Sequence, residues 1–262
     1  MNLELKNKPV LVCASSAGLG KATALEFARE GAQVMLCGRH AAQLQQAAAQ
    51  IDAATGQEPR WTVADLSQAQ DIAHLMEATV SAFGGLYTLV YNSGGPPAGS
   101  FDQFDDAAWQ RAYEQNLLGC VRTIRAALPH LRQGSGGRIV NFASTSVKSP
   151  IDNLILSNTF RTGVLGLTKS LAAELAADGI LVNLLGPGRI HTARTEQLDA
   201  LRAQQAGVSV EQISQDVCRN IPLRRYGTPQ EFGKIAVFLG SPVNTYITGQ
   251  TLLVDGGMVK AY

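Results

Sequence analysis

The sequence predicts an α/β fold, with one doubly wound parallel sheet of about seven strands in a single domain that spans residues 1–262. Short apolar runs alternate with longer segments in which apolar residues recur every three or four positions, and this alternation is typical of βαβ units. The runs are apolar throughout, as expected of parallel strands that are buried on both faces. A length of 262 residues fits a single α/β domain.

Seven apolar runs are expected to form the strands of the sheet. They are residues 9–14 (PVLVCA), 32–38 (AQVMLCG), 60–65 (RWTVAD), 86–92 (LYTLVYN), 137–144 (GRIVNFAS), 179–186 (GILVNLLG) and 250–257 (QTLLVDGG). The first intervening segment, residues 19–32, places Leu19, Leu25 and Ala28 roughly on one face of a helix. At least six helices are expected, among them an Ala- and Gln-rich surface helix within residues 40–57.

One stretch, residues 189–220, has no strand pattern. Leu198, Leu201, Ile213 and Val217 are spaced there as in short amphipathic helices. Long excursions at the end of a strand often cover a ligand site. We therefore expect this segment to form a lid over a substrate site.

Composition narrows the class of ligand. Hydrophobic residues make up 45% of the chain and the formal net charge is +1, so there is no basic excess that would indicate nucleic acid as a partner. A small molecule is the expected ligand. The first residues do not resemble a secretory signal, and no apolar run approaches the roughly 20 residues of a membrane span.

The cysteines indicate the compartment. They lie far apart in the sequence and form no CxxC pair, which argues against a zinc site and against a disulfide framework. We expect four reduced thiols, no metal and a cytoplasmic location. The four residues are Cys13, Cys37, Cys120 and Cys218.

The first strand leads into a loop of small residues, "CASSAGLGKAT" at positions 13–23, which opens a helix. Small residues in such a loop let the backbone approach a pyrophosphate, and the free N–H groups of the helix N-terminus hold the anion. Gly18 and Gly20 are the glycines of this loop. Loops of this composition also occur between strands and helices without any ligand. The position after the first strand favours a dinucleotide site of the Rossmann type.

The second strand ends about twenty residues later at "LCGRH", where the residue that selects the ribose belongs. An acidic side chain there would accept a hydrogen bond from a 2′-hydroxyl, but this chain has Arg39, whose guanidinium suits a 2′-phosphate. NADP(H) is therefore expected rather than NAD(H). The alternative is that Arg39 is only a solvated residue at a strand end.

At this point the chain resembles the short-chain dehydrogenase/reductase family nearly from end to end. "CASSAGLG" is similar to the family's TGxxxGxG turn, "ADLS" to its adenine-binding segment, "LVYNSGG" to its NNAG segment and "LLGPGRIHT" to the segment beside the nicotinamide carboxamide. The ending "YITGQTLLVDGGM" resembles that of bacterial 3-oxoacyl thioester (acyl-carrier-protein) reductases. The resemblance implies these cofactor-binding residues: Cys13, Ser15, Ser16, Gly18, Leu19, Gly20, Arg39, Asp65, Leu66, Asn92, Ser93, Gly94, Arg161, Pro187, Gly188, Ile190 and Thr192.

The resemblance also implies an assembly. The family's fold has strand order 3-2-1-4-5-6-7. Its members often form homotetramers, joined through helices that correspond to residues 106–131 and 157–177 and through the C-terminal strand.

The expected catalytic residues are Ser144, Asn116, Ser157 and Arg161. The resemblance gives Ser144 the role of orienting the substrate and Asn116 that of holding a structural water. The family's tyrosine acid and its lysine are absent, because positions 157 and 161 hold serine and arginine, and none of the six tyrosines has a lysine four residues later. A serine hydroxyl is far less acidic than a phenol, and arginine stays protonated. Arg161 is still expected to donate to the nicotinamide ribose.

Three other side chains could supply the proton. Lys148 lies four residues beyond Ser144, but exposed lysines are the commoner case. His191 has a suitable ordinary pKa, with a partly exposed loop histidine as the alternative. Tyr91 has the right chemistry, but its place at the end of a buried strand favours a packing role. A fourth route uses Ser144 as the donor, with water relaying the proton.

Two hypotheses about function follow. The first is an NADP(H)-dependent oxidoreductase that acts on a carbonyl or alcohol, such as a 3-oxoacyl thioester, with an altered acid. The second is a cofactor-binding protein of the same fold with little or no turnover, a sensor or a partner subunit. The cofactor motifs favour the first hypothesis, and the pair Ser157 and Arg161 favours the second.

Overall fold

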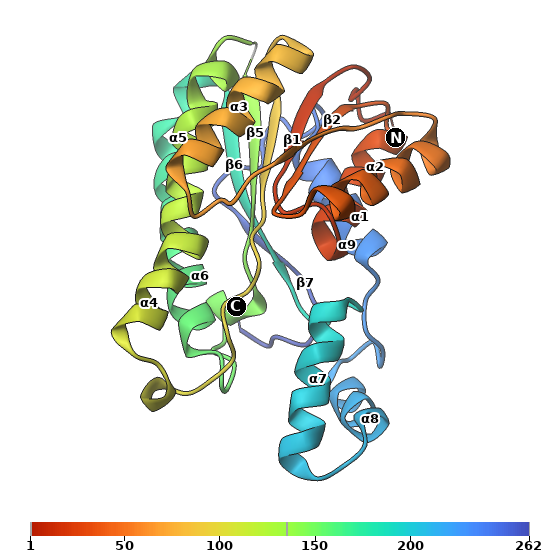
Figure 1. The fold of residues 1–262 in the computed structure, drawn as a ribbon, viewed down its shortest axis with the longest axis vertical. Helices are drawn as coiled ribbons and strands as arrows, with labels where there is room; N and C mark the ends of the chain where they lie inside the picture. The colour runs from red at the N-terminus through yellow and green to blue at the C-terminus, as the bar shows by residue number, and fades with distance from the viewer. Residues whose placement is uncertain (1, 135, 262) are drawn as a thin grey trace.

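The computed structural model describes residues 2–134 and 136–261. Its seven strands form one parallel sheet of order β3-β2-β1-β4-β5-β6-β7 (Figure 1). The predicted fold class and all seven predicted strands are confirmed. The strands are β1 (Pro9–Val12), β2 (Gln33–Gly38), β3 (Arg60–Val63), β4 (Thr88–Tyr91), β5 (Gly137–Phe142), β6 (Ile180–Pro187) and β7 (Thr251–Val254).

Helices cover both faces of the sheet (Figure 1). Three of them, α1 (Gly18–Arg29), α2 (Ala41–Thr55) and α9 (Pro229–Leu239), lie on one face. The other face carries α3 (Ala69–Phe83), α5 (Gly119–Arg132) and α6 (Ile155–Glu174).

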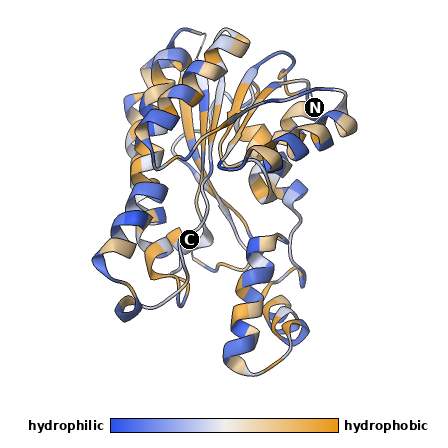
Figure 2. Ribbon diagram, in the orientation of Figure 1, coloured by the Kyte–Doolittle hydropathy of each residue, from blue (hydrophilic) through white to orange (hydrophobic). Residues whose placement is uncertain are grey.

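The strands supply side chains to both hydrophobic cores. Along β1, Val10 and Val12 pack in one cluster, whereas Leu11 and the following Cys13 pack in the other. This alternation follows from the two-residue period of a strand, and it explains why the inner strands are mainly apolar on both faces. Figure 2 shows the apolar strands enclosed between the two helical layers.

The strand order reverses between β1 and β4. The chain crosses from β1 to β2 and β3 on one side of the sheet and then returns to place β4 on the other side of β1. In open α/β sheets a ligand binds at such a switch point, outside the carboxyl ends of the strands. The loops that follow β1 and β4 are therefore the expected walls of a binding crevice.

A π-helical turn interrupts the helix expected over residues 106–131. The observed elements are α4 (Asp106–Tyr113), the π-turn η2 (Glu114–Leu118) and α5. Two helical carbonyl groups there accept side-chain donors: Asn116 Nδ2 donates to Ala112 O at 3.1 Å, and Tyr91 Oη donates to Gln115 O at 2.9 Å. A side chain that inserts into the carbonyl ladder is a known cause of such a turn, and π-turns are frequent at functional sites.

The predicted lid segment consists of two helices, α7 (Ala193–Ala206) and α8 (Val210–Asn220), which extend beyond the carboxyl edge of the sheet (Figure 1). Thr192 and Ser209 cap their N-termini with side-chain oxygens. The amphipathic pattern is incomplete, because Leu201 is 42% exposed. In the part of the chain that the structure describes, no helix has the length and apolar character needed to cross a membrane.

Candidate active site

The sheet order brings the predicted site residues into one row. Asp65 follows β3, Arg39 follows β2, Asn92 follows β4 and Ser144 follows β5, while the small-residue loop follows β1. Because the strands are parallel, all of these residues lie at the same carboxyl edge of the sheet. We use the name cofactor crevice for the region between the loop after β1, at Gly18, and the loop after β4, at Gly95, where the family resemblance implies the cofactor.

The loop after β1 is held in a tight turn. A β-carbon on Gly20 would lie 2.3 Å from Ala14 O, so only glycine fits there. Gly18 has a φ of +56°, which glycine adopts without strain. The N-cap residue of α1, Ala17, has no side-chain oxygen, and the first turn of α1 contains no acidic residue. The N–H groups and partial positive charge of this helix end are therefore directed at an anion, which fits a dinucleotide diphosphate.

Three residues of this loop support its shape from within. Ala14, where the family has a glycine, adopts a φ of +46°, which is unusual for alanine. The hydroxyl of Ser15 is buried, donates to Val12 O at 2.7 Å and accepts from Cys37 N at 3.0 Å. Cys13 is also fully buried, and its pKa is raised by a hydrogen bond to the Cys37 thiol and by burial. Their side chains position the loop rather than line the crevice.

Arg39 follows β2 beside Ser16 of the loop after β1, where the family resemblance implies the adenosine end of the cofactor. A β-carbon on Gly38 would lie 3.4 Å from Ser16 Oγ, so this hydroxyl is next to the residue before Arg39. Arg39 is exposed and, among the described residues, forms no ion pair with a carboxylate. A guanidinium and a hydroxyl at this point suit a 2′-phosphate.

Asp65 and Leu66 occupy the loop after β3. The Oδ1 atom of Asp65 accepts from Ser67 N at 2.9 Å and from Ser67 Oγ at 2.8 Å, which fixes the turn. Leu66 is 8% exposed. The pair is therefore ordered at the end of the row, where the resemblance places the adenine.

The loop after β4 connects the crevice to the π-turn. Asn92 Nδ2 donates to Ala14 O at 3.2 Å and joins the two walls of the crevice. Ser93 Oγ donates to Asn116 Oδ1 at 3.3 Å. Gly94 follows on the exposed side. Asn116 is fully buried, so it holds this loop from behind.

Arg161 is buried, with 5% of its surface exposed. Its Nη1 donates to Phe142 O at 2.9 Å and its Nη2 to Ser93 O at 3.1 Å. Burial lowers the pKa of this guanidinium, but arginine remains protonated in proteins. Arg161 thus ties the end of β5 to the loop after β4, and two hydrogen bonds leave three of its five N–H donors for a ligand.

Ser144 and Ser157 are the residues that the family resemblance places at the reaction centre. Ser144 caps the 3-10 turn η3 (Thr145–Val147), and its Oγ accepts from Ser146 N at 3.1 Å, which leaves its own proton for another acceptor. Ser157 lies in the first turn of α6, one turn before Arg161 on the same face, and is half-buried. A hydroxyl near this edge can donate to a carbonyl oxygen, but the phenol of the family is absent.

The three alternative candidates for the acid, Tyr91, His191 and Lys148, lie either in the core or on the surface. Tyr91 is fully buried, its hydroxyl donates to a backbone carbonyl, and burial raises its pKa well above the ordinary value. The side chain of His191 is 66% exposed and lies 3.9 Å from the Glu196 carboxylate. Lys148 is exposed after the turn η3. These observations support the packing role for Tyr91 and the surface interpretation of His191 and Lys148.

The segment after β6 contains the last of the predicted cofactor-binding residues. Gly188 packs so closely on Asp255 that a β-carbon would lie 2.5 Å from the Asp255 Cβ. Ile190 is 3% exposed and pairs with Gly227. Thr192 Cγ2 lies 3.9 Å from where a β-carbon on Gly18 would stand. Pro187 ends β6. This segment therefore reaches back to the loop after β1.

Sequence reasoning missed two features of the lid. Asp199, 3% exposed, accepts from Arg189 Nη1 at 3.2 Å and from Tyr226 Oη at 2.7 Å, which fixes α7 at its second turn. Arg194, in the first turn of α7, reaches the loop after β4. A cation in the first turn of a helix opposes the helix dipole; that conflict is visible in the sequence "HTART" and could have identified Arg194.

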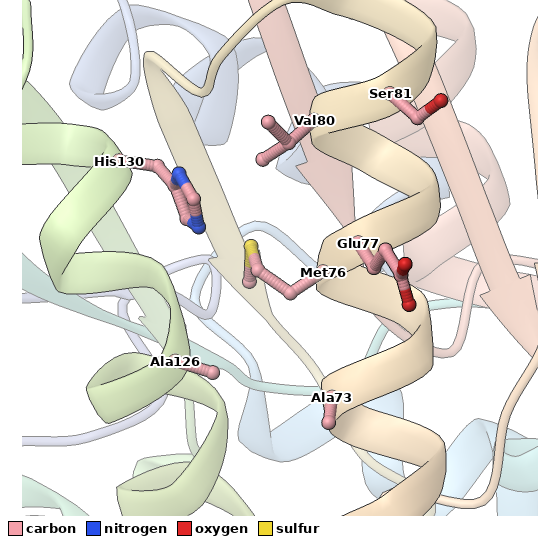
Figure 3. Close-up of a pocket in the computed structure, with 7 residues that line it drawn as sticks. All are labelled: Ala73, Met76, Glu77, Val80, Ser81, Ala126 and His130. Atoms are coloured by element: carbon pink, nitrogen blue, oxygen red, sulfur yellow. The ribbon is translucent and has the colours of Figure 1, made fainter.

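A surface groove of about 540 Å³ lies elsewhere, between α3 and α5. Figure 3 shows Met76 of α3 and His130 of α5 facing each other across it. Its remaining lining residues are Ala73, Glu77, Val80, Ser81 and Ala126. None of the predicted site residues lines this groove, so it is separate from the crevice.

Comparison with known proteins gives consistent matches along the whole chain. Residues 13–259 match the family described as Enoyl-(Acyl carrier protein) reductase. Dehydrogenase/reductase SDR family member 4 from Oryctolagus cuniculus is 32% identical over 254 residues, which cover 97% of this chain and 94% of the relative.

Two solved structures are similar in fold and sequence. L-Sorbose reductase from Gluconobacter frateurii, complexed with NADPH and L-sorbose, has a TM-score of 0.95 and 29% identity, with all of both chains covered. The NADPH-bound short chain oxidoreductase from Pseudomonas aeruginosa PAO1, which contains an atypical catalytic center, has a TM-score of 0.89 and 28% identity, covering 98% of this chain and 99% of that chain.

Proposed function

Because the chain belongs to the short-chain dehydrogenase/reductase family, whose members are oxidoreductases, we propose that it uses NADP(H) to interconvert a carbonyl compound and its alcohol. The observation that supports the proposal is that the predicted cofactor residues from Asp65 to Thr192 lie along one edge of the sheet. The related proteins that bear names of activity are dehydrogenases and reductases, which gives no support to a binding protein without turnover.

The preference for NADP(H) rests on Arg39. The end of β2 carries a guanidinium beside the Ser16 hydroxyl, and the residue after β2 has no carboxylate to repel a 2′-phosphate. Three similar structures contain NADPH, which supports a nicotinamide cofactor.

Titration with NADPH and NADH tests this preference. The Arg39→Ala variant should bind NADPH about 10–100-fold more weakly, since a charge-assisted contact contributes about 1.5–3 kcal/mol, and should bind NADH as before. Arg60→Ala, an exposed arginine at the opposite end of the neighbouring strand, is the matched control. Equal affinity of the unmodified protein for both cofactors would contradict the assignment.

In the proposed reaction, the main contribution of the protein is to position the substrate and the cofactor. The cofactor, when bound, supplies or accepts hydride. Ser144 would donate a hydrogen bond to the carbonyl oxygen, and Arg161 would hold the nicotinamide ribose with the N–H donors that Phe142 O and Ser93 O leave over. Asn116 and Ser93 keep the loop after β4 in place. The proton reaches the oxygen through Ser144 from water, and Ser157 lines the pocket.

The substrate is a small carbonyl or alcohol, with 3-oxoacyl thioesters as one candidate class. We propose that α7 and α8, within residues 189–220, form the lid that selects it, since the first turn of α7 lies between the two walls of the crevice. A panel of thioester, sugar and simple ketone substrates, run with NADPH, identifies the class. Tight binding of NADPH without turnover of any member would favour the cofactor-binding alternative.

We also propose a homotetramer in the cytoplasm. Four aromatic rings contact one another in a chain on the 3-10 turn before α4, on α4 and on α6: Phe101, Trp109, Phe160 and Tyr113. Their centroid distances are 5.8–6.1 Å, and Phe101 is 68% exposed. Leu252 on the edge strand β7 is 44% exposed. These apolar surfaces support burial between subunits, and the four free thiols support a reducing compartment. Light scattering that shows a monomer at micromolar concentration would contradict the tetramer.

A further inference from the structure

Arg194 spans part of the crevice from the lid. Its Nη2 donates to Pro96 O at 2.8 Å, and its Nη1 donates to Gln197 Oε1 at 3.2 Å. A β-carbon on Gly95 would lie 3.7 Å from both Nε and Nη2, so the guanidinium packs against this glycine. The side chain therefore rests on the loop after β4.

The same helical turn also reaches the other wall of the crevice. Thr192, the N-cap of α7, approaches Gly18 in the loop after β1 with its Cγ2 atom. The first turn of α7 thus passes from one wall to the other, above the switch point between β1 and β4. Arg194 thus stands beside the region between the two loops where the proposed cofactor would bind.

A positive charge at position 194 is unfavourable in free energy. Arg194 is half-buried, and burial lowers its pKa. It stands in the positive first turn of a 14-residue helix, and within residues 2–134 and 136–261 it forms no ion pair with a carboxylate. Two of its five donors are used, and three remain. An anion would offset both the burial and the helix dipole.

The backbone at this position is fixed independently of the arginine. Asp199, less than two turns later on α7, is bonded to Arg189 and Tyr226 from two other segments. The α7 backbone is therefore anchored by Asp199, and the guanidinium is held by Pro96 O and Gln197 Oε1, so little ordering is needed to bind an anion.

From this geometry we propose that Arg194 is an anion-binding residue of the lid, which holds an anionic oxygen group of a ligand in the crevice. The inference rests on the proposed function insofar as a dinucleotide occupies that crevice. The anionic group has two sources: the diphosphate of the cofactor, or a carboxylate or phosphate of the substrate.

The first arm of the test addresses the cofactor. Arg194→Gln removes the charge and retains an amide that can donate to Pro96 O, whereas Arg194→Lys retains the charge. If the diphosphate is the ligand, Arg194→Gln should raise the dissociation constant of NADPH by about 10–100-fold and leave that of adenosine 2′,5′-bisphosphate, which lacks the diphosphate bridge, unchanged. Arg194→Lys should recover much of the NADPH affinity.

The second arm addresses the substrate. Protein saturated with NADP⁺ is titrated calorimetrically with acetoacetate and with its neutral counterpart acetylacetone. If a substrate anion is the ligand, Arg194→Gln should weaken acetoacetate binding about 10–100-fold without affecting acetylacetone. Arg202→Gln, the same change on the same helix, is the control for both arms.

The outcomes separate this inference from the proposed function. A variant Arg194→Gln that binds both NADPH and acetoacetate as the unmodified protein does would overturn the role of Arg194 alone. Failure of the unmodified protein to bind NADPH would overturn the proposed function itself.

Discussion

The cofactor crevice and the proton-transfer position at residue 157 are built in different ways. The crevice is made mainly by backbone: the turn at Gly18 and Gly20, the N-terminus of α1, and carbonyl groups fixed by Asn92. The proton-transfer position that the family resemblance implies depends on the chemistry of one side chain, and the residue predicted to occupy that position is Ser157.

This difference explains how the chain can keep the cofactor-binding pattern of the family and still depart from it at the position of the general acid. A site made of backbone groups tolerates new side chains, as Ala14 shows by adopting a φ of +46° where glycine is usual. A general acid cannot be exchanged in this way, because its catalytic efficiency depends on its pKa. We infer that the protein keeps the cofactor geometry and has reduced its acid catalysis.

The largest effect is expected from filling the crevice turn. Gly20→Ala places a β-carbon 2.3 Å from Ala14 O and 3.0 Å from Asn92 Nδ2, so the backbone of the loop must move. NADPH affinity should fall by at least about 100-fold, and stability by about 1–3 kcal/mol. Fluorescence titration and thermal unfolding measure the two effects.

Gly85→Ala, in the loop before β4, is the matched control for that variant. Nothing lies within 4 Å of its added β-carbon and its φ is not positive, so stability and NADPH affinity should change little. Equal NADPH affinity of Gly20→Ala and Gly85→Ala would contradict a crevice that is built by the backbone.

The next effect is expected on kcat, from removal of the Ser144 hydroxyl. Ser144→Ala should lower kcat by about 10²–10³-fold, as expected for the loss of one donor to a developing oxyanion. Ser146→Ala, two residues away, is the comparison, since the Ser146 Oγ is buried and has no hydrogen-bond partner among the described atoms. It should retain activity. A neutral Ser144→Ala variant would mean that the acid has moved to another residue.

A smaller effect is expected at the base of the lid. Burial and the hydrogen bond to Asp199 raise the pKa of Tyr226 to about 12. Because this folded-state pKa exceeds the ordinary value of 10.0, the stabilisation by Tyr226 is complete below pH 10 and is lost as the pH rises towards 12. Tyr226→Phe should destabilise the protein by about 1–2 kcal/mol at neutral pH.

Phenolate absorbance against pH checks this assignment. The transition near pH 12 should be absent in Tyr226→Phe, while NADPH binding to that variant should change little. A variant with unaltered stability at pH 7 would show that Asp199 holds α7 through Arg189 alone.

The sequence sufficed for the features that depend on local pattern. All seven strands could be predicted from their short, mainly apolar runs, although only the inner strands are buried on both faces and the edge strands β3 and β7 are partly exposed. That Ser157 and Arg161 stand in place of the family's tyrosine and lysine remains a prediction from the resemblance.

Features that depend on contacts between distant segments could not be predicted. The π-turn at Asn116 requires the Tyr91 hydroxyl, 24 residues away, to bond Gln115 O. The bond between Arg194 and Pro96 joins residues 98 positions apart. Ser15, expected among the cofactor-binding residues, turns its hydroxyl towards Val12 and Cys37, because the turn brings β1 and β2 together. No periodicity in the sequence reports these contacts.

Restoring the family pair tests the central claim most directly. Hydride transfer in a single turnover is measured with NADPH and a carbonyl panel for the unmodified protein, Ser157→Tyr, Arg161→Lys and the double variant, with NADPH affinity confirmed for each. We predict that the double variant is faster than the unmodified protein by about 10²–10⁴-fold, the usual contribution of a general acid. An unmodified protein that already matches the double variant, and loses its activity in Lys148→Ala or His191→Ala, would contradict the account.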